Sequence, residues 1–191
     1  MTTLIIVGND KIGGKALQKI KNFSGIEVFC DRSTNIKRVI KLLRRKKLTI
    51  LLVFKMFFAE ILRKGEKPKK NIPTIKSNKT LLELLKKNNY EKVILFRAGL
   101  IVNKQVIETG INMLNIHAAS LPDFAGIGSI EKALVKKAYC QKATLHKLIE
   151  SIDSGEVISE LDYKLDPQKS YLDNEDIAYS AAIKLLVKTL N

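Results

Sequence analysis

Short apolar runs that alternate with segments of helical spacing limit the folds open to this chain more than any other feature. Each run has the length of a short strand, and the run Leu48–Phe54 is apolar throughout, as expected of a strand buried on both faces. The expected strands are Leu4–Val7, Ile26–Phe29, Leu48–Phe54 and Lys92–Phe96. The expected helices between them are Ile12–Phe23, Asn35–Lys47 and Thr80–Asn88. Strands that alternate with helices pair in parallel, so we predict an α/β fold with a Rossmann-like, doubly wound, mostly parallel sheet and helices on both faces.

The pattern changes after Met113. A helix is expected near Ser129–Lys137, and two alternating apolar runs follow it at Lys142–Ile149 and Glu156–Leu165, before a last helix that reaches Leu190. We expect these elements to form a small C-terminal extension of the sheet. The 191 residues have the length of one ordinary domain, so we expect residues 1–191 to be a single domain.

Positive charge is concentrated in the first part of the chain. Residues 1–111 hold 25 Lys and Arg against 8 Asp and Glu, a net charge of +17, whereas the remainder has a net charge of −2. Part of this excess is expected on the outer face of the helix Asn35–Lys47, with Ile40 facing inward, and part on an exposed loop at Arg63–Lys70. Such an excess either steers a polyanion or forms a solvated surface. Few aromatic residues interleave with the basic runs, so we do not expect nucleic acid as the partner.

No targeting segment, membrane span or metal site is expected from the sequence. No apolar run approaches the roughly 20 residues of a membrane helix, and no basic region precedes the apolar run at the N-terminus. We therefore expect a cytoplasmic protein with no membrane partner. The two histidines, His117 and His146, do not have the spacing of a metal site, so we expect no metal.

The turn after the first strand, Gly8-Asn9-Asp10, leads into a helix whose N-terminus could hold an anion. Asp10 stands where a dinucleotide-binding motif requires its second glycine, and the pattern of a phosphate-binding P-loop is also incomplete. An anion site and a plain tight turn both remain open at this position.

The stretch Met113–Pro122 combines an apolar run with two polar side chains near its end. Asn115 and His117 are two residues apart, so in a strand both point to the same side. Open α/β sheets bind ligands at the carboxyl ends of their strands, and we therefore expect a site here. Asp153 lies in a turn between two expected strands and is either catalytic or a local cap. His146 alternates with apolar neighbours, which favours a half-buried structural role.

Taken together, these motifs resemble the folate-dependent formyltransferases, which include the glycinamide ribonucleotide, methionyl-tRNA and nucleotide-sugar enzymes. The matching residues are Asn115-Ile-His117, Leu121-Pro122, Gly126 and Asp153-Ser-Gly155. Asp153 follows His117 by 36 positions. The segment Ala98–Val106 is similar to the family segment whose backbone holds the pterin ring. His146 matches a residue often found in the family's Thr-x-His.

The resemblance implies transfer of a formyl group from 10-formyltetrahydrofolate to an amine of a small acceptor. The catalytic residues would be Asn115, His117 and Asp153. The donor would be bound by Gly99, Leu100, Ile101, Val102, Val106 and Gly155. The acceptor would be bound by Gly8, Asn9, Asp10, Leu121, Pro122 and Gly126. In this mechanism Asn115 donates to the oxyanion. His117 either donates to the same oxygen or moves the amine proton, and Asp153 keeps His117 cationic and relays protons through water.

Departures from the family pattern bear on the acceptor. Ala118 and Ala119 replace residues common in the family, Phe124-Ala-Gly126 lacks the usual arginine, and the first turn lacks the phosphate-cradling Gly-Ser-Asn. We also expect no C-terminal domain of the kind that the tRNA enzymes carry. We expect a phosphorylated or sugar-linked amine rather than tRNA, and a monomer or homodimer. The alternatives are a formyltetrahydrofolate hydrolase and a non-catalytic relative that binds folate or an anion.

Overall fold

One mixed sheet organises the structure, a computed structural model that describes residues 2–33, 36–46 and 48–191. Within these residues seven strands lie in the order β3-β2-β1-β4-β5-β6-β7. The strands are β1 Thr2–Gly8, β2 Ile26–Asp31, β3 Thr74–Ile75, β4 Tyr90–Phe96, β5 Asn112–His117, β6 Cys140–Lys147 and β7 Val157–Lys164. The helices are α1 Lys11–Ile20, α2 Ile36–Arg44, α3 Ile50–Leu62, α4 Asn78–Lys87, α5 Lys104–Ile107, α6 Ser129–Val135 and α7 Tyr171–Leu190.

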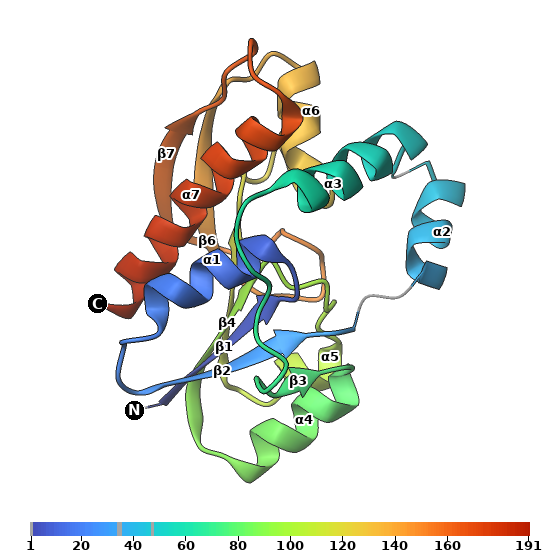
Figure 1. Cartoon of the computed structure of the whole chain (residues 1–191). Helices are drawn as coiled ribbons and strands as arrows, with labels where there is room; N and C mark the ends of the chain where they lie inside the picture. The colour runs from blue at the N-terminus through green and yellow to red at the C-terminus, as the bar shows by residue number, and fades with distance from the viewer. Residues whose placement is uncertain (1, 34–35, 47) are drawn as a thin grey trace.

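The strands β3, β2, β1, β4 and β5 are parallel, whereas β6 runs antiparallel to both of its neighbours, β5 and the edge strand β7. A strand that follows its parallel neighbour needs a crossover connection, which the intervening helices provide. The loop 148–156 joins the antiparallel neighbours β6 and β7 directly, as a hairpin does. The predicted Rossmann-like, mostly parallel α/β fold is confirmed, and the expected C-terminal extension consists of β6, β7 and α7 (Figure 1).

Two apolar cores lie on opposite faces of the sheet because alternate residues of each strand point to opposite sides. One core contains Ile5 and Val7 of β1, and α1 and α7 pack on it. The other contains Leu4 and Ile6 of the same strand, and α4 and α5 cover it. All four of these β1 side chains are fully buried. The continuous apolar run at the N-terminus is therefore the sequence of a central strand.

The strand predicted at Leu48–Phe54 is wrong, because the chain there forms α3, Ile50–Leu62. The Thr49 side chain caps this helix by accepting a hydrogen bond of 3.1 Å from the backbone N–H of Leu52. A short apolar run fits a buried strand or a helix equally well, and here the apolar character continues for a helix length. The third strand in chain order is instead the two-residue β3.

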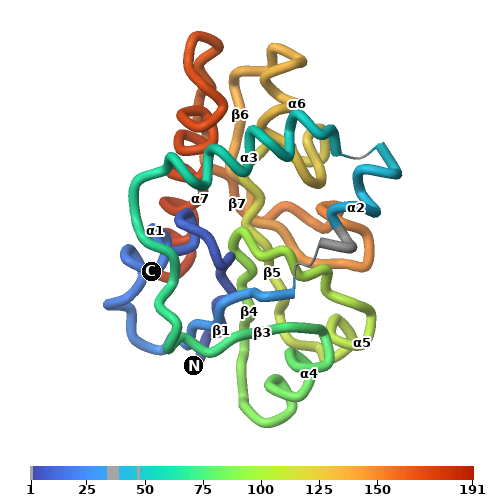
Figure 2. Tube along the Cα trace, turned by 45° about the vertical axis from the view of Figure 1, so that its right-hand side comes forward, coloured from blue at the N-terminus to red at the C-terminus, as the bar shows by residue number. Residues whose placement is uncertain are grey.

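The predicted basic helix Asn35–Lys47 is present as α2, although both of its predicted end residues lie outside the described part of the chain. The expectation that Ile40 faces inward is wrong, since it is 42% exposed. In Figure 1, α2 stands apart from the sheet. Figure 2 shows α3 crossing in front of α6 and α7. Leu52 of α3 packs closely on Gly128, because a Cβ added at Gly128 would lie 2.6 Å from the Leu52 side chain.

The predicted exposed loop Arg63–Lys70 begins with a buried residue, and for Arg63 the prediction is wrong. Its guanidinium pairs with Glu175 and with Asp176 of α7, each at 2.6 Å. Glu175 also pairs with Arg97, which follows β4, at 3.0 Å, and Arg97 pairs with Asp10 at 2.5 Å. This ion-pair network connects the end of α3, the helix α7 and the carboxyl ends of two central strands.

Candidate functional site

The candidate site lies where the parallel strands end. The strands β1, β2, β4 and β5 run in the same direction, so their carboxyl ends meet at one edge of the sheet. Asn115 of β5 lies opposite Leu95 of β4 on one side and opposite His146 of β6 on the other. The register thereby brings His146, which is fully buried, beside the predicted Asn115.

Four side chains form a polar cluster at this edge: Asn115, His117, His146 and Asp153. The amide nitrogen of Asn115 lies 3.0 Å from Nε2 of His146 and 3.3 Å from Oδ1 of Asp153. Nδ1 of His117 lies 3.5 Å from Oδ2 of Asp153, and Nε2 of His146 lies 3.5 Å from Oδ1. The three residues predicted to be catalytic are thus in one cluster. The fourth, His146, also belongs to it, although its sequence context favoured only a structural role.

The hydrogen bonds of His146 fix its tautomer. Its Nδ1 lies 2.9 Å from the backbone carbonyl of Lys147, which can only accept, so Nδ1 carries the proton. Its Nε2 then accepts from the amide of Asn115. The second N–H of this amide points to the carboxylate of Asp153, so both amide hydrogens of Asn115 have partners.

His117 is neutral near neutral pH. Its Nε2 donates to the backbone carbonyl of Phe124 at 2.9 Å, which leaves the lone pair on Nδ1, the nitrogen that faces Asp153. Burial lowers the pKa of His117 and outweighs the opposite effect of the Asp153 carboxylate. The expectation that Asp153 keeps His117 cationic is therefore wrong. A neutral imidazole is instead suited to accept a proton.

Asp153 is held as an anion by its surroundings. Burial alone raises the pKa of its carboxyl, but interactions with the imidazoles of His146 and His117 and with the N–H of Gly126 lower the pKa to about 2. The N–H of Gly126 donates to Oδ2 at 2.8 Å. The backbone of Asp153 has a φ of +50°, a left-handed conformation that aspartate tolerates better than most residues.

Gly155 brings the loop that carries Asp153 against β6. A Cβ at Gly155 would lie 1.9 Å from the backbone carbonyl oxygen of Lys147, so a side chain at this position does not fit. The same carbonyl accepts the hydrogen bond from His146. Gly155 was predicted to bind the donor, and in the structure its contact is with the strand that carries His146.

The segment after β4 contains the other residues predicted to bind the donor. Leu100, Val102 and Val106 are buried in the second apolar core, whereas Ile101 is 45% exposed. The carboxylate of Asp31, at the end of β2, accepts hydrogen bonds from the backbone N–H groups of Gly99 and Leu100. Asp31 therefore fixes this segment at the same edge as the polar cluster, a role that the sequence did not reveal.

The turn predicted to bind the acceptor, Gly8-Asn9-Asp10, precedes α1. Asn9 is exposed, and the carboxylate of Asp10 accepts from the N–H of Gly13 at 2.8 Å. The carboxylate of Glu60, from α3, accepts from the N–H of Lys11 at 3.1 Å and 3.3 Å. Two carboxylates of the chain itself thus occupy the N-terminus of α1, where an anion would otherwise bind.

The remaining predicted acceptor residues lie between β5 and α6. A cis peptide bond joins Leu121 to Pro122, and Pro122 is exposed. Gly126, with a φ of +80°, is in contact with the polar cluster through Asp153. Within the described residues no group of three or more His, Cys, Asp and Glu side chains is arranged to hold a metal ion.

Sequence reasoning missed two residues of this region, Asp31 and Glu60, and its residue-level argument gave a third, His146, only a structural role. Each acts across elements, and only the strand register or the packing of α3 reveals its partner. The family's Thr-x-His was the one signal in the sequence that pointed to His146.

These features define a Rossmann-like α/β protein with a partly buried polar site at the carboxyl edge of its sheet. The sequence profile of the formyl transferase family matches residues 28–190, so the chain belongs to this family. The resemblance identified from the sequence motifs is confirmed.

Curated relatives of the chain include methionyl-tRNA formyltransferases. The protein from Caldicellulosiruptor saccharolyticus is 25% identical over 117 residues, which are 61% of this chain and 38% of the relative. The protein from Sulfurihydrogenibium sp. is 25% identical over 134 residues, 67% of this chain and 43% of the relative. The chain thus spans about two fifths of the length of these relatives.

Solved structures share the fold. A phosphoribosylglycinamide formyltransferase from Anaplasma phagocytophilum has a TM-score of 0.68 at 15% identity and covers 98% of this chain and 84% of its own. A sugar N-formyltransferase from Shewanella sp. has a TM-score of 0.66 at 16% identity, over 100% of this chain and 68% of its own. At these identities the likeness establishes the fold.

Proposed function

We propose that residues 1–191 form a catalytic domain that transfers a formyl group from 10-formyltetrahydrofolate to an amine of a small acceptor. The observation that carries the proposal is the polar cluster, in which an amide, a neutral imidazole and an ionised carboxylate are in contact at the edge of the sheet. Formyl transfer needs these three properties: a donor for the carbonyl oxygen, a base for the amine and a charge that stabilises the protonated base.

Asn115 would stabilise the negative charge that develops on the formyl oxygen as the amine nitrogen forms its bond to the formyl carbon. A donor of this kind lowers the barrier by roughly 3 kcal/mol in comparable sites. Both amide hydrogens of Asn115 have partners, so one of these two hydrogen bonds must break when substrate binds. The longer bond, 3.3 Å to Asp153, is the one we expect to open.

His117 would take the proton that the attacking amine loses. Its Nε2 donates to the carbonyl of Phe124, so Nδ1 has the free lone pair and is the atom that accepts the proton. Asp153, 3.5 Å away, would stabilise the imidazolium that results. The bond between the formyl carbon and the donor nitrogen then breaks, and this nitrogen receives the proton that His117 took from the amine, which returns His117 to its neutral form.

The segment after β4 would hold the formyl donor, which supplies the formyl group on a nitrogen. The residues that fit this role are Gly99, Leu100, Ile101, Val102 and Val106, together with Gly155 on the opposite loop. Asp31 fixes the backbone of this segment beside β5, and a fixed backbone suits the binding of a flat ring. The anionic tail of the donor suits the strongly basic N-terminal part of the chain.

The acceptor is better described as a sugar-linked amine than as glycinamide ribonucleotide. The carboxylates of Asp10 and Glu60 already hold the N–H groups at the start of α1, and a phosphate at this position would be repelled by them. On the acceptor side we propose Leu121, Pro122 and Gly126, with Gly8 and Asn9 at the neighbouring turn.

Turnover of 10-formyltetrahydrofolate with three acceptor conditions tests the proposal: a nucleotide amino-sugar, glycinamide ribonucleotide and no acceptor. We expect deformylation that depends on the amino-sugar. Asn115→Ala and Asp153→Ala should each reduce it by at least a hundredfold. The matched controls are Asn112→Ala, exposed at the other end of β5, and Asp162→Ala, exposed on β7, which should retain activity.

Three outcomes contradict this proposal. A rate that is the same with and without acceptor indicates hydrolysis of the donor. Full activity of both Asn115→Ala and Asp153→Ala, or no binding of the donor by calorimetry, leaves the polar cluster without a catalytic role.

A further inference from the structure

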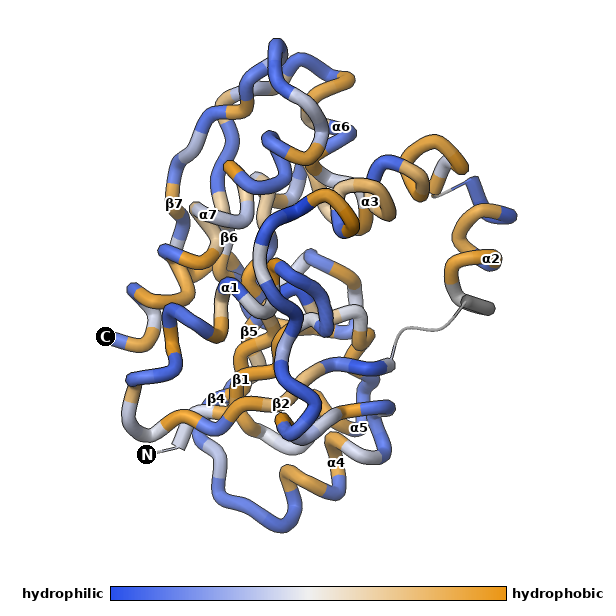
Figure 3. The backbone as a smooth tube through the Cα atoms, viewed as in Figure 1, coloured by the Kyte–Doolittle hydropathy of each residue, from blue (hydrophilic) through white to orange (hydrophobic). Residues whose placement is uncertain are grey.

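One face of α3 is apolar and exposed to solvent. The seven side chains that form it are between 52% and 67% exposed. They are Ile50, Leu51, Phe54, Phe57, Phe58, Ile61 and Leu62. At 100° per residue they fall within an arc of about 140°, and no polar residue of α3 lies inside this arc. Leu52 and Ala59, on the opposite side of the helix, are buried. We call this surface the α3 apolar face; Figure 3 shows the apolar character of α3.

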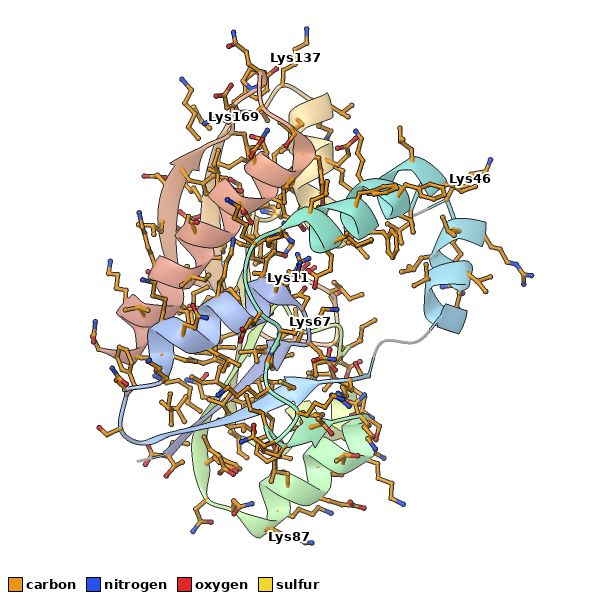
Figure 4. All side chains as sticks on the ribbon, in the orientation of Figure 1. Lys11, Lys46, Lys67, Lys87, Lys137 and Lys169 are labelled. Atoms are coloured by element: carbon orange, nitrogen blue, oxygen red, sulfur yellow. The ribbon has the colours of Figure 1, made fainter. Side chains whose placement is uncertain are left out.

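Basic residues flank the α3 apolar face on both sides in the sequence. Residues 36–70, here named the α2–α3 lobe, contain 13 Lys and Arg against 2 Asp and Glu, a net charge of +11. The described basic residues before α3 that are exposed are Lys41, Arg44, Arg45 and Lys46, and those after it include Lys64, Lys69 and Lys70. Figure 4 shows Lys46 at the outer end of the α2–α3 lobe, away from the sheet.

An exposed apolar face of this extent marks a surface that binds something. The flanking charge selects among the possible occupants. A second copy of the chain would place one α2–α3 lobe with a net charge of +11 against another with the same charge. Protein interfaces are complementary in charge, so this arrangement is disfavoured. Nucleic acid would satisfy the basic residues, but exposed Ile and Leu gain nothing from a phosphate backbone. A bilayer with anionic headgroups satisfies both features at once.

We propose that the α2–α3 lobe binds the surface of a bilayer that contains anionic phospholipid. The α3 apolar face enters the boundary between headgroups and acyl chains, and the flanking lysines and arginines contact lipid phosphates. None of the described helices is long and apolar enough to cross a membrane. The proposal revises the expectation of no membrane partner, which considered only spanning segments, and it does not depend on the formyl acceptor.

Co-sedimentation with vesicles tests the proposal. We expect binding to vesicles of phosphatidylcholine with phosphatidylglycerol, little binding to phosphatidylcholine alone, and weaker binding at high salt. Replacement of Phe54, Phe57 and Phe58 together by Ser should weaken binding at least tenfold. The matched control is Val135→Ser with Ile149→Ser, which removes side chains 73% and 44% exposed on other elements and should leave binding unchanged.

A second pair of matched variants tests the contribution of charge to vesicle binding. Replacement of Arg44, Arg45 and Lys46 by Gln should weaken binding at least tenfold. Replacement of Lys79, Lys86 and Lys87 by Gln changes the net charge equally on α4, where these residues are exposed, and should have a much smaller effect.

A fluorescent reporter locates the contact. The chain has no tryptophan, so Phe57→Trp introduces a single one in the α3 apolar face. Its emission should shift to shorter wavelength with anionic vesicles, whereas that of Val135→Trp should not.

Three results overturn the proposal. The first is no binding to anionic vesicles. The second is a dimer in sedimentation equilibrium that the Phe triple variant dissociates while vesicle binding is unaffected. The third is vesicle binding that depends on the lysines and arginines but not on the phenylalanines, because a purely electrostatic surface would equally bind RNA.

Discussion

At the scale of single residues, the position of the Asn115 amide depends on a histidine that we do not expect to touch substrate. Nε2 of His146 accepts one amide hydrogen, and Nδ1 is anchored to the backbone of Lys147. His146 therefore holds the amide nitrogen in the orientation from which its other hydrogen reaches Asp153, and then substrate. It is a positioning residue, and its effect should appear in kcat more than in KM.

Two replacements of His146 separate positioning from packing. In Gln the side-chain oxygen reaches the place of Nε2 and can accept from Asn115, whereas Asn is too short. We expect His146→Asn to lower kcat on the order of a hundredfold with little change in KM, because a small misplacement of a catalytic group is costly. His146→Gln should recover most of this loss. Equal kcat values for the two variants at similar stability would contradict a positioning role.

The acid stability of the fold should depend on Asp153. Its folded pKa of about 2 is below the ordinary value of 3.8, so its contribution is present above 3.8 and is lost as the pH falls through about 2. The lost free energy is about 2 kcal/mol. The pKa of His117 is also lowered, so its protonation opposes folding below its ordinary value of 6.5.

Urea unfolding between pH 5 and 2 measures the effect of Asp153. The wild-type chain should lose stability over this range more steeply than Asp153→Asn, because asparagine has no carboxylate that becomes protonated as the pH falls. Parallel curves for the two proteins would show that the carboxylate is not stabilised by its neighbours.

At the scale of elements, the loop between β6 and β7 sets the position of Asp153. Gly155→Ala should displace it, because the new Cβ would meet a backbone oxygen at 1.9 Å and neither strand can yield cheaply. We expect a fall in activity on the order of a hundredfold. Gly110→Ala is the control: its Cβ meets nothing within 4 Å, but its φ of +77° makes the substitution strained. Gly110→Ala should lower the free energy of unfolding and leave the activity unchanged.

Elements buried on both faces could be predicted from the sequence, and α3 could not. β1 and β4 read as continuous apolar runs because both of their faces contact a core. The run at Leu48–Phe54 has the same composition but belongs to a helix with an exposed apolar face, which the rule that apolar residues are buried does not anticipate. β3, with two residues, is too short to leave a pattern.

Some residues of the candidate site could likewise be predicted from the sequence, and others could not. Asn115 and His117 follow from the two-residue period of a strand, and Asp153 required the resemblance to a family because a turn aspartate has many local roles. His146 depends on the antiparallel register of β5 and β6, which no local pattern specifies. Glu60 reaches α1 only through the fold of α3, so an error in the secondary structure of that segment concealed it.

At the scale of the whole molecule, the ion-pair network joins the α2–α3 lobe to the site-bearing sheet. The Arg63 side chain is 0% exposed and that of Glu175 is 2% exposed, and Glu175 also contacts Arg97 beside the first turn. Removal of one partner from a buried pair leaves the other charge uncompensated, which costs more than the pair itself contributes. The attachment of the lobe is therefore sensitive to single substitutions in the network.

A double-mutant cycle with Arg63→Gln and Glu175→Gln measures this coupling. Each single variant should be destabilised by about 3 kcal/mol in urea unfolding. The double variant should be less destabilised than the sum of the two, by 1 kcal/mol or more as an order of magnitude for side chains in one network. Lys147 and Glu156, an exposed pair at the same 2.6 Å separation, are the control, and their coupling should be much smaller than that of Arg63 and Glu175 because solvent screens the pair. Additive effects at Arg63 and Glu175 would mean that burial, not their pairing, determines the stability of this junction.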